Sequence, residues 1–229
     1  MLECVTTRLP LSPTERSTPQ RSANRAVAER EILDEVLDAG LVCHLAVTVD
    51  GAPLVLPTGY GRDGDTLYLH GSTGSASMRA GSAGVPVCVA VTLLDGIVYA
   101  RSVFHHSVNY RSAVVHGRAV PVTDDAAKLR GLRVLTEHLA PGSWDYTRQP
   151  SRKELAATTL LALDLAEASV KIRAGSPIDE PDDVDTHEGW AGVLPLRRIW
   201  GPPVSSDDLP AGVDAPAHVT RRPAPDPPC

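Results

Sequence analysis

A turn rich in glycine and serine follows an apolar strand pattern and carries side chains suited to binding an anion. Within the stretch 67–79, Gly71 ends the strand pattern, and Ser75, Ser77 and Arg79 come where a helical pattern begins. The first N–H groups of a helix are free, and the helix dipole there favours negative charge. We therefore expect this turn to bind a phosphate group. The alternative is an ordinary strand-to-helix turn with a serine cap.

Histidines gather in the stretch 101–117, where one strand pattern gives way to the next. The polar members of this stretch are His105, His106, Asn109, Tyr110, Arg111 and His116. Imidazole titrates near neutral pH and can serve as a proton donor, a metal ligand or a haem ligand. Adjacent strand residues point to opposite faces, so His105 and His106 are not expected to bind one ion together. No HxH pair or carboxylate partner completes a ligand set, and we predict no metal site.

A third polar stretch lies near residue 170. Lys171 and Arg173 are two residues apart, so they share one face of an extended chain and can meet a phosphate or a ring oxyanion. The acidic run 179–185 lacks the spacing of an EF-hand loop, and we expect a solvated loop there. The basic pair is the second candidate for anion binding.

Composition narrows the function classes. The 229 residues carry a formal net charge of −6, with a pI near 5.7, which argues against binding to nucleic acid or to an anionic membrane. The apolar stretches are far shorter than the ~20 residues of a membrane-spanning helix, and no apolar signal segment begins the sequence. We expect a cytoplasmic protein. Glycine-rich nucleotide loops, the GxSxG elbow and the HExxH motif are also missing.

Four cysteines stand far apart, at Cys4, Cys43, Cys88 and Cys229. They form neither a CxxC pair nor the dense pattern of a disulfide-rich domain. We expect Cys43 and Cys88 to be buried core thiols, because free cysteine is often buried, and the other two to lie in the tails.

The two ends of the chain differ in composition from the middle. Residues 1–22 mix Thr, Ser, Pro and Arg without apolar periodicity, and we expect a mobile arm there. Residues 203–229 are rich in proline and should be extended rather than helical or in a sheet. One folded domain, residues 23–202, lies between these tails, and its length suits a single core.

Apolar periodicity in this domain predicts short helices between strands. Helices are expected at 26–37, with Gly40 as a stop, at 75–83, and at 124–139, with Asp124 as the cap. Strands are expected at 42–49, 53–60, 66–70, 85–93, 97–104, 110–122 and 158–165. The strands on either side of Asp95-Gly96 would form a hairpin. Six or seven strands with three helices suit a small closed β-barrel with helices packed on it.

Several motifs occur together in an order that is specific to one family. They are Pro57-Thr-Gly-Tyr60, Leu67-Tyr-Leu-His-Gly-Ser72, Phe104-His-His-Ser-Val-Asn-Tyr-Arg-Ser112, Lys153-Glu-Leu-Ala-Ala157, Ala168-Ser-Val-Lys-Ile-Arg-Ala-Gly175 and Trp190-Ala-Gly-Val193. This set resembles the flavin-nucleotide-binding branch of the pyridoxamine 5′-phosphate oxidase-like family over residues 23–202. The resemblance implies a mainly β fold with flanking helices, in which a six-stranded antiparallel split β-barrel forms a homodimer and binds FMN in a groove at each of two interfaces.

The resemblance also assigns FMN-binding positions. They are Val55, Leu56, Pro57 and Thr58 at the ring edge, Leu69, His70, Gly71 and Ser72 along the ribityl chain, Ser75, Ser77 and Arg79 at the phosphate, Arg111 and Ser112 near the ring from either subunit, and Lys171 as a further candidate. Relatives usually carry a basic residue directly after the first serine of the phosphate turn, where this chain has Ala76. A lost charge-assisted contact of about 1.5–3 kcal/mol weakens FMN binding by one to two decades unless Arg79 replaces it.

Three functions are compatible with these residues. The first is an FMN-dependent oxidoreductase acting on a small molecule, in which the protein orients flavin and substrate and no catalytic residue is assigned. The second is a flavin-binding protein without turnover, which would use the same cofactor residues. The third, motivated by Ala76, is a split barrel that has lost FMN. Such a protein would bind haem or another planar ligand through His70, His105 or His106, or serve as a biosynthetic enzyme without a redox cofactor.

Overall fold

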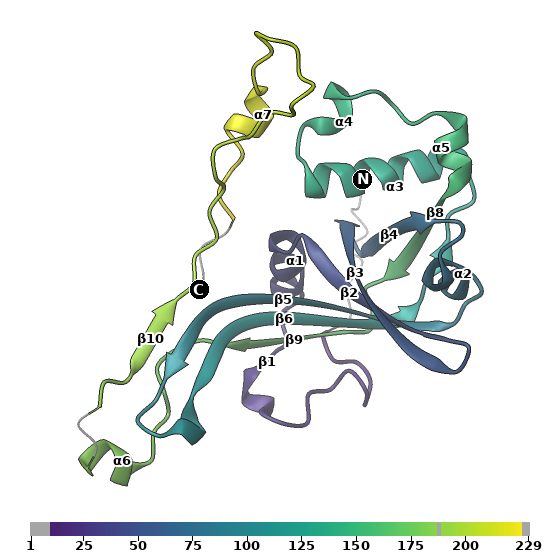
Figure 1. Ribbon diagram of the computed structural model, residues 1–229. Coiled ribbons are helices and arrows are strands. Elements are labelled where there is room, and N and C mark those ends of the chain that lie inside the picture. Colours follow the sequence, from purple (N-terminus) through teal and green to yellow (C-terminus); the bar gives the residue numbers. More distant parts are fainter. Residues whose placement is uncertain (1–9, 187–188, 226–229) are drawn as a thin grey trace, which may run out of the picture.

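The computed structural model describes residues 10–186 and 189–225, and its centre is one antiparallel sheet. The strands are β1 (Ala26–Val27), β2 (Val42–Val49), β3 (Ala52–Asp63), β4 (Thr66–Ser72), β5 (Pro86–Tyr99), β6 (Ser107–Arg118), β7 (Val120–Pro121), β8 (Thr158–Asp164), β9 (Ala168–Arg173) and β10 (Gly192–Pro195). They hydrogen-bond in the order β1-β9-β6-β5-β2-β3-β4-β8-β7, and β10 pairs with β5. The expected class, mainly β with flanking helices in a split barrel, is confirmed (Figure 1).

Helices pack on this sheet and at its ends. They are α1 (Arg30–Ala39), α2 (Ala76–Ser82), α3 (Asp125–Leu139), α4 (Ser143–Tyr146), α5 (Arg152–Ala157), α6 (Pro181–Thr186) and α7 (Ala217–Thr220), with 3-10 turns η1 (Ala23–Arg25) and η2 (Val103–His105). Among these, α1 contacts β5, β6 and β9, while α3 lies across β3, β4 and β8. Figure 1 shows α3, α4 and α5 together at one end of the molecule.

The helix α1 ends at Gly40, as its sequence predicts. The Tyr60 hydroxyl donates to the carbonyls of Leu37 and Gly40, and a Cβ on Gly40 would lie 2.6 Å from that hydroxyl oxygen. Glycine at this position therefore allows the tyrosine to bind the last turn of the helix. The helix begins at residue 30 rather than 26, because Ala26 and Val27 pair with β9 as the short strand β1.

Close backbone contact fixes α3 on the sheet. A Cβ on Gly61 of β3 would lie 2.8 Å from the Leu135 Cα, so only glycine allows the helix to approach this strand. The predicted cap forms, since the Asp124 carboxylate accepts a hydrogen bond from the Ala127 N–H at 2.7 Å. These contacts position the helix face that borders the candidate site.

The predicted hairpin about Asp95-Gly96 is wrong. A single strand, β5, runs through both residues and pairs with β6 along its length, with a β-bulge between Leu94 and Gly96. The chain reverses later, at residues 100–106. The bulge turns Asp95 inward, where its carboxylate accepts hydrogen bonds from Arg111, and β10 packs against Gly96. Tertiary pairing has therefore overridden a local turn signal.

The strand expected at 110–122 also differs from the structure. It begins earlier, as β6 from Ser107, and stops at Arg118, after which β7 pairs with β8. The strand expected at 158–165 is present as β8, and β9 and β10 follow it. Six strands, β2 to β6 and β8, have seven or more residues, and they match the six strands of the expected barrel.

The two interior cysteines have different surroundings. Cys43 belongs to the hydrophobic core, and its burial raises the pKa of the thiol to about 12. Cys88 is only half-buried, because it occupies an outward position of β5, and this corrects the expectation of a core thiol. Cys4 and Cys229 lie outside the described residues.

The two ends of the described chain make defined contacts. Leu11 is buried in the core, the Ser12 N–H donates to the Ala168 carbonyl at 2.7 Å, and Arg16 forms an ion pair with Glu167. These contacts correct the expectation of a mobile arm for residues 10–22, whereas residues 1–9 lie outside the described residues. The segment 196–225 is mostly without helix or strand, and α7 is a short exception to the expected extended tail.

Candidate functional site

The residues predicted along β3 and β4 divide between two faces of the sheet. The exposed side chains are Val55, Pro57, His70 and Ser72, whereas Leu56, Thr58, Leu69 and Gly71 are partly or fully buried. This division follows from the strand period of two, since consecutive side chains point to opposite faces. Only the first group can offer side chains to a ligand on the outer face, and the second can offer backbone groups.

The predicted phosphate turn lies between β4 and α2, with Ser75 at the N-cap position. Its hydroxyls contact one another and the backbone: Ser75 Oγ and Ser77 Oγ are 2.9 Å apart, and Ser72 Oγ accepts from the Gly74 N–H at 3.1 Å. Arg79 is exposed, and its guanidinium donates to the Gly74 carbonyl. The structure therefore brings one cation, three hydroxyls and the start of α2 to the same turn.

The predicted residues of β6 and β9 have different environments. Arg111 is buried and points inward, and its guanidinium donates to both carboxylate oxygens of the half-buried Asp95, at 3.0 and 3.1 Å. Ser112 and Lys171 face outward as register partners. The Lys171 ammonium donates to the Arg21 carbonyl at 2.7 Å. Arg111 thus supports the bulge from the inner side of the sheet. Of the cofactor-binding residues predicted on β6 and β9, Ser112 and Lys171 remain on the outer face.

The basic pair expected at Lys171 and Arg173 is only half available. Arg173 is buried, and its guanidinium donates to the Asn109 side-chain oxygen and to the carbonyls of Gly175 and Ser176. Burial lowers the pKa of Arg173, because it penalises the charged form. Arg173 therefore braces the end of β9, and Lys171 is the partly exposed cation of the two.

One chain does not bring all predicted residues together. The predicted residues between 55 and 79 lie on β3, β4 and the turn into α2, whereas Arg111, Ser112 and Lys171 lie on β6 and β9. Two strands, β5 and β2, separate the groups in the sheet, and neighbouring strands are about 4.8 Å apart. Within one chain, Ser112 therefore lies three strand positions from the β3 residues, and Lys171 lies four strand positions from them.

His70 lines two neighbouring hollows beside α3. One, of about 190 Å³, is lined by Gly59, Tyr60, His70, Leu132, Leu135, Thr136, Leu139 and Ala140. The other, of about 300 Å³, shares His70, Leu132 and Thr136 and also has Trp144, Thr147, Arg148, Gln149, Pro150, Glu154 and Thr158 in its wall. We call the two hollows together the His70 slot. Their walls combine leucine side chains with one imidazole and one guanidinium, which is the mixture that ligand pockets commonly show.

Desolvation favours the neutral form of the His70 imidazole. Crowding by the apolar walls lowers the pKa of His70, since desolvation penalises the imidazolium form. Within the described part of the chain, the imidazole makes no protein hydrogen bond. A neutral ring with a free nitrogen lone pair is the form that binds a metal ion.

The guanidinium of Arg148, which lines the slot, is held in place by the carboxylate of Glu154. Arg148 is exposed and donates to both carboxylate oxygens of Glu154, at 2.7 and 2.8 Å. These bonds, together with the capping bond from the Ser151 N–H, hold the pKa of Glu154 well below its usual range. The wall formed by residues 147–154 therefore presents a charged guanidinium beside an apolar floor.

The other candidate histidines lie at the turn between β5 and β6. The His106 Nδ1 accepts from the Ala100 N–H at 2.9 Å, and the His105 Nε2 is 3.7 Å from the Glu180 carboxylate. They face different partners, but His105 lies in the 3-10 turn η2 and His106 follows it, so the premise that both are strand residues is wrong. Among the described residues there is no group of three or more His, Cys, Asp or Glu side chains placed to hold a metal ion.

Sequence reasoning missed most of the slot wall. Leu132, Leu135 and Leu139 all line the slot from α3, where Leu135 is buried and Leu139 is 51% exposed. Trp144 and Arg148 lie after the helix and belong to no recognisable motif.

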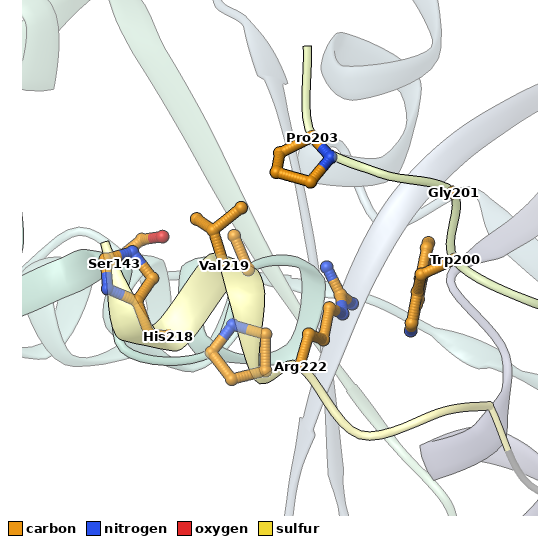
Figure 2. Close-up of a pocket in the computed structure, with 9 residues that line it drawn as sticks. Ser143, Trp200, Gly201, Pro203, His218, Val219 and Arg222 are labelled. Atoms are coloured by element: carbon orange, nitrogen blue, oxygen red, sulfur yellow. The ribbon is translucent and has the colours of Figure 1, made fainter. Parts of the chain in front are cut away.

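A separate hollow of about 180 Å³ lies between the C-terminal segment and the end of α3 (Figure 2). Figure 2 shows the Arg222 side chain beside the Trp200 ring, and its guanidinium carbon is 4.2 Å from the centroid of the indole. None of the predicted site residues lines this hollow. The stacked cation makes it a packing feature of the tail.

Within the described residues, no helix is both long and apolar enough to cross a bilayer.

Comparisons with known proteins agree with this geometry. The family model described as pyridoxamine 5′-phosphate oxidase matches residues 29–172. The solved structure of the FAD and heme binding protein from Mycobacterium smegmatis is 41% identical, covers 87% of this chain and 98% of its own, and has a TM-score of 0.83. The flavocytochrome Anf3 from Azotobacter vinelandii is 35% identical, covers 93% and 98%, and has a TM-score of 0.87. A comparison with curated proteins found no match.

Proposed function

Because the chain belongs to the pyridoxamine 5′-phosphate oxidase family, we propose that it is a redox protein that binds a flavin and a haem. One of the two similar structures is named for FAD and heme, and the other is named a flavocytochrome. The motifs suggested FMN, which shares its ring, ribityl chain and first phosphate with FAD. The same positions can serve both flavins, and FAD is the one to test first.

One observation carries the haem proposal: His70 is exposed, kept neutral and lies against an apolar slot. The leucines of α3 suit the porphyrin face, and Arg148 suits a carboxylate substituent at the slot rim. The residues present therefore fit the group. In this proposal His70 would hold the haem iron, whereas His105 and His106 retain their partners on the turn between β5 and β6.

The flavin would lie on the outer face next to the haem. Val55 and Pro57 offer an exposed floor, and the turn at Ser75 and Arg79 offers donors to a phosphate. His70 and Ser72 are two residues apart on one face of β4, a separation of about 7 Å along the strand. When bound, the flavin supplies two-electron chemistry and the haem supplies one-electron chemistry, and an oxidoreductase acting on a small molecule follows from that combination.

A homodimer would complete the flavin groove. The outer face of the sheet presents small or apolar side chains, including the register partners Ala90 and Val114, and Leu94 and Val55 are 40% and 58% exposed. A contiguous face of this kind supports association. A second copy on this face would bring its Ser112 and Lys171 toward the β3 and β4 residues of the first.

An absorption spectrum tests the proposal directly. Protein reconstituted with FAD and haem, and then separated from free cofactor by gel filtration, should show both flavin bands and a Soret band. Light scattering of the same peak should give the mass of a dimer. A spectrum without a Soret band would contradict haem binding, and a colourless protein would contradict both cofactors.

A further inference from the structure

The far end of the β5–β6 hairpin forms an arm that projects beyond the barrel. We call residues 96–108, 176–186 and 189–195 the arm, which includes η2, α6 and β10. The strand β10 adds a third strand to this end, because Gly192 to Pro195 pair with Tyr99 to Gly96. Figure 1 shows the arm at the opposite end of the molecule from α3 and α5. The arm therefore cannot reach the His70 slot of its own chain.

Polar contacts hold the turn of the arm in one shape. Asp179 has a side chain that is 2% exposed, and it accepts hydrogen bonds from the Arg101 backbone N–H at 2.9 Å and from the Arg101 guanidinium at 2.8 Å. The His106 Nδ1 accepts from the Ala100 N–H on the other side of the turn. A turn that is already ordered loses less entropy when it binds a partner.

The tip that these contacts present is apolar and uncovered. Val103 and Phe104 are 89% and 86% exposed, and Phe104 is the one phenylalanine of the chain. The same arm exposes Ile178 and Trp190. Exposed aromatic and aliphatic side chains on an ordered element are the usual anchors of protein interfaces.

Charge narrows the choice of partner. The segment 179–185 carries five acidic residues and no basic one. Asp179 pairs with the Arg101 guanidinium, so the charge of that one residue is neutralised by an arginine of the arm. This charge opposes an anionic membrane surface, so the tip is not suited to insertion into one. It suits an apolar hollow that has a basic border.

The His70 slot meets that description. Its floor includes Leu132 and the half-exposed Leu139. The wall carries Arg148, which pairs with Glu154, and the exposed Arg152 and Lys153 lie beside this wall in α5 without lining the hollow. The slot therefore offers apolar contact and the opposite charge to the arm.

We propose that the arm of one copy seats Val103 and Phe104 on the His70 slot of a second copy, so that two chains close each slot. The contact is continuous with the dimer face assigned above, since the arm is the extension of β5 and β6. This inference rests on the proposed function for what the slot holds, but not for the docking itself.

Photo-crosslinking tests the docking. Phe104 is replaced by p-benzoylphenylalanine, which keeps an aromatic ring there, and the protein is mixed with an isotopically labelled copy before irradiation. We expect crosslinks between copies that map to residues 132–154. Val204, which is 92% exposed in the C-terminal segment, carries the same probe in the control. Crosslinks confined to one chain, crosslinks to other surfaces, or a yield no higher than the Val204 control would overturn the proposal.

Haem titration separates this proposal from the proposed function. Phe104→Ser should raise the haem Kd about tenfold, as the loss of an aromatic anchor over the slot predicts, while Ile199→Ser, at an equally exposed site, should not change it. If the wild type binds haem and the crosslinks map elsewhere, the docking is overturned and the function stands. If the wild type binds no haem but the crosslinks map to 132–154, the docking stands and the function fails.

Discussion

Histidine has opposite surroundings at the two ends of the barrel. At the arm, the His106 ring nitrogen accepts a backbone hydrogen bond, and the nearby Arg101 and Arg111 are each bound by a buried or nearly buried aspartate. At the slot, the His70 imidazole makes no protein hydrogen bond within the described residues and faces a hollow. Polar groups that bind one another stabilise a shape, whereas an unbound imidazole beside apolar walls can bind a ligand. The comparison thus assigns a structural role to His106 and a binding role to His70.

The largest effect is expected where the arm leaves the barrel. Asp95→Ala removes the carboxylate from the buried Arg111 guanidinium, so the free energy of unfolding should fall by about 3–5 kcal/mol. Urea denaturation followed by circular dichroism measures this change. Asp145→Ala is the matched control, because its pair with Arg133 is exposed and should contribute no more than about 1 kcal/mol. Equal effects of the two variants would show that the Asp95 pair is not structural.

The next effect distinguishes the two kinds of histidine. His70→Ala should weaken haem binding by at least about a hundredfold, because the imidazole that would bind the iron is lost. His106→Ala should leave the Soret band in place. Haem titrations of both variants, read by absorbance, check the contrast. Loss of the Soret band in His106→Ala alone would reverse the assignment of the two ends.

A smaller effect is expected at the phosphate turn. Arg79→Ala should raise the Kd for FMN and FAD about tenfold, since one charge-assisted contact is lost, while the exposed position of Arg79 spares the fold. Ala76→Arg should tighten binding by restoring a cation to the turn. Fluorescence titration of the flavin measures both. A parent-like Kd for Arg79→Ala would place the phosphate elsewhere.

Much of the fold was predictable, because the strand pattern depends on local alternation that burial of one face reinforces. The exception, Asp95-Gly96, shows the limit of local signals. An Asp-Gly pair between apolar runs favours a hairpin, but β6 pairs with β5 on both sides of it, and the inward Asp95 finds Arg111. A partner sixteen residues away in the sequence thus decides the conformation.

The site was predictable only in part. His70 and Arg79 could be predicted because each lies in a contiguous stretch of sequence that resembles the family's motifs. The slot wall is assembled from β3, β4, α3 and the loop before α5, and no stretch of sequence records that assembly. Strand alternation also halved the predicted set, since Leu69 is in the core while His70 is exposed.

The smallest expected effect is the pH dependence of haem binding. Iron binds the neutral imidazole, and the pKa of His70 lies below its ordinary 6.5 because of burial. Haem affinity should therefore be constant above pH 6.5 and should fall only when the pH passes below the lowered pKa. The same lowered pKa affects the stability of the apoprotein, because below pH 6.5 the unfolded chain binds more protons at His70 than the folded chain does. The contribution of His70 to the free energy of unfolding is therefore complete above pH 6.5 and is lost as the pH falls through the folded pKa.

Haem titrations between about pH 5 and 8 measure the midpoint of this loss. Burial also lowers the pKa of His138, so both histidines contribute to the pH dependence of stability. Comparing the parent with His70→Ala isolates the contribution of His70 to stability, whereas haem binding reports on His70 alone. The variant His70→Ala should lose less stability than the parent between the two ends of this pH range. A binding midpoint at or above 6.5 would mean that the slot does not desolvate His70, and the distinction between the two ends of the barrel would then rest on hydrogen bonding alone.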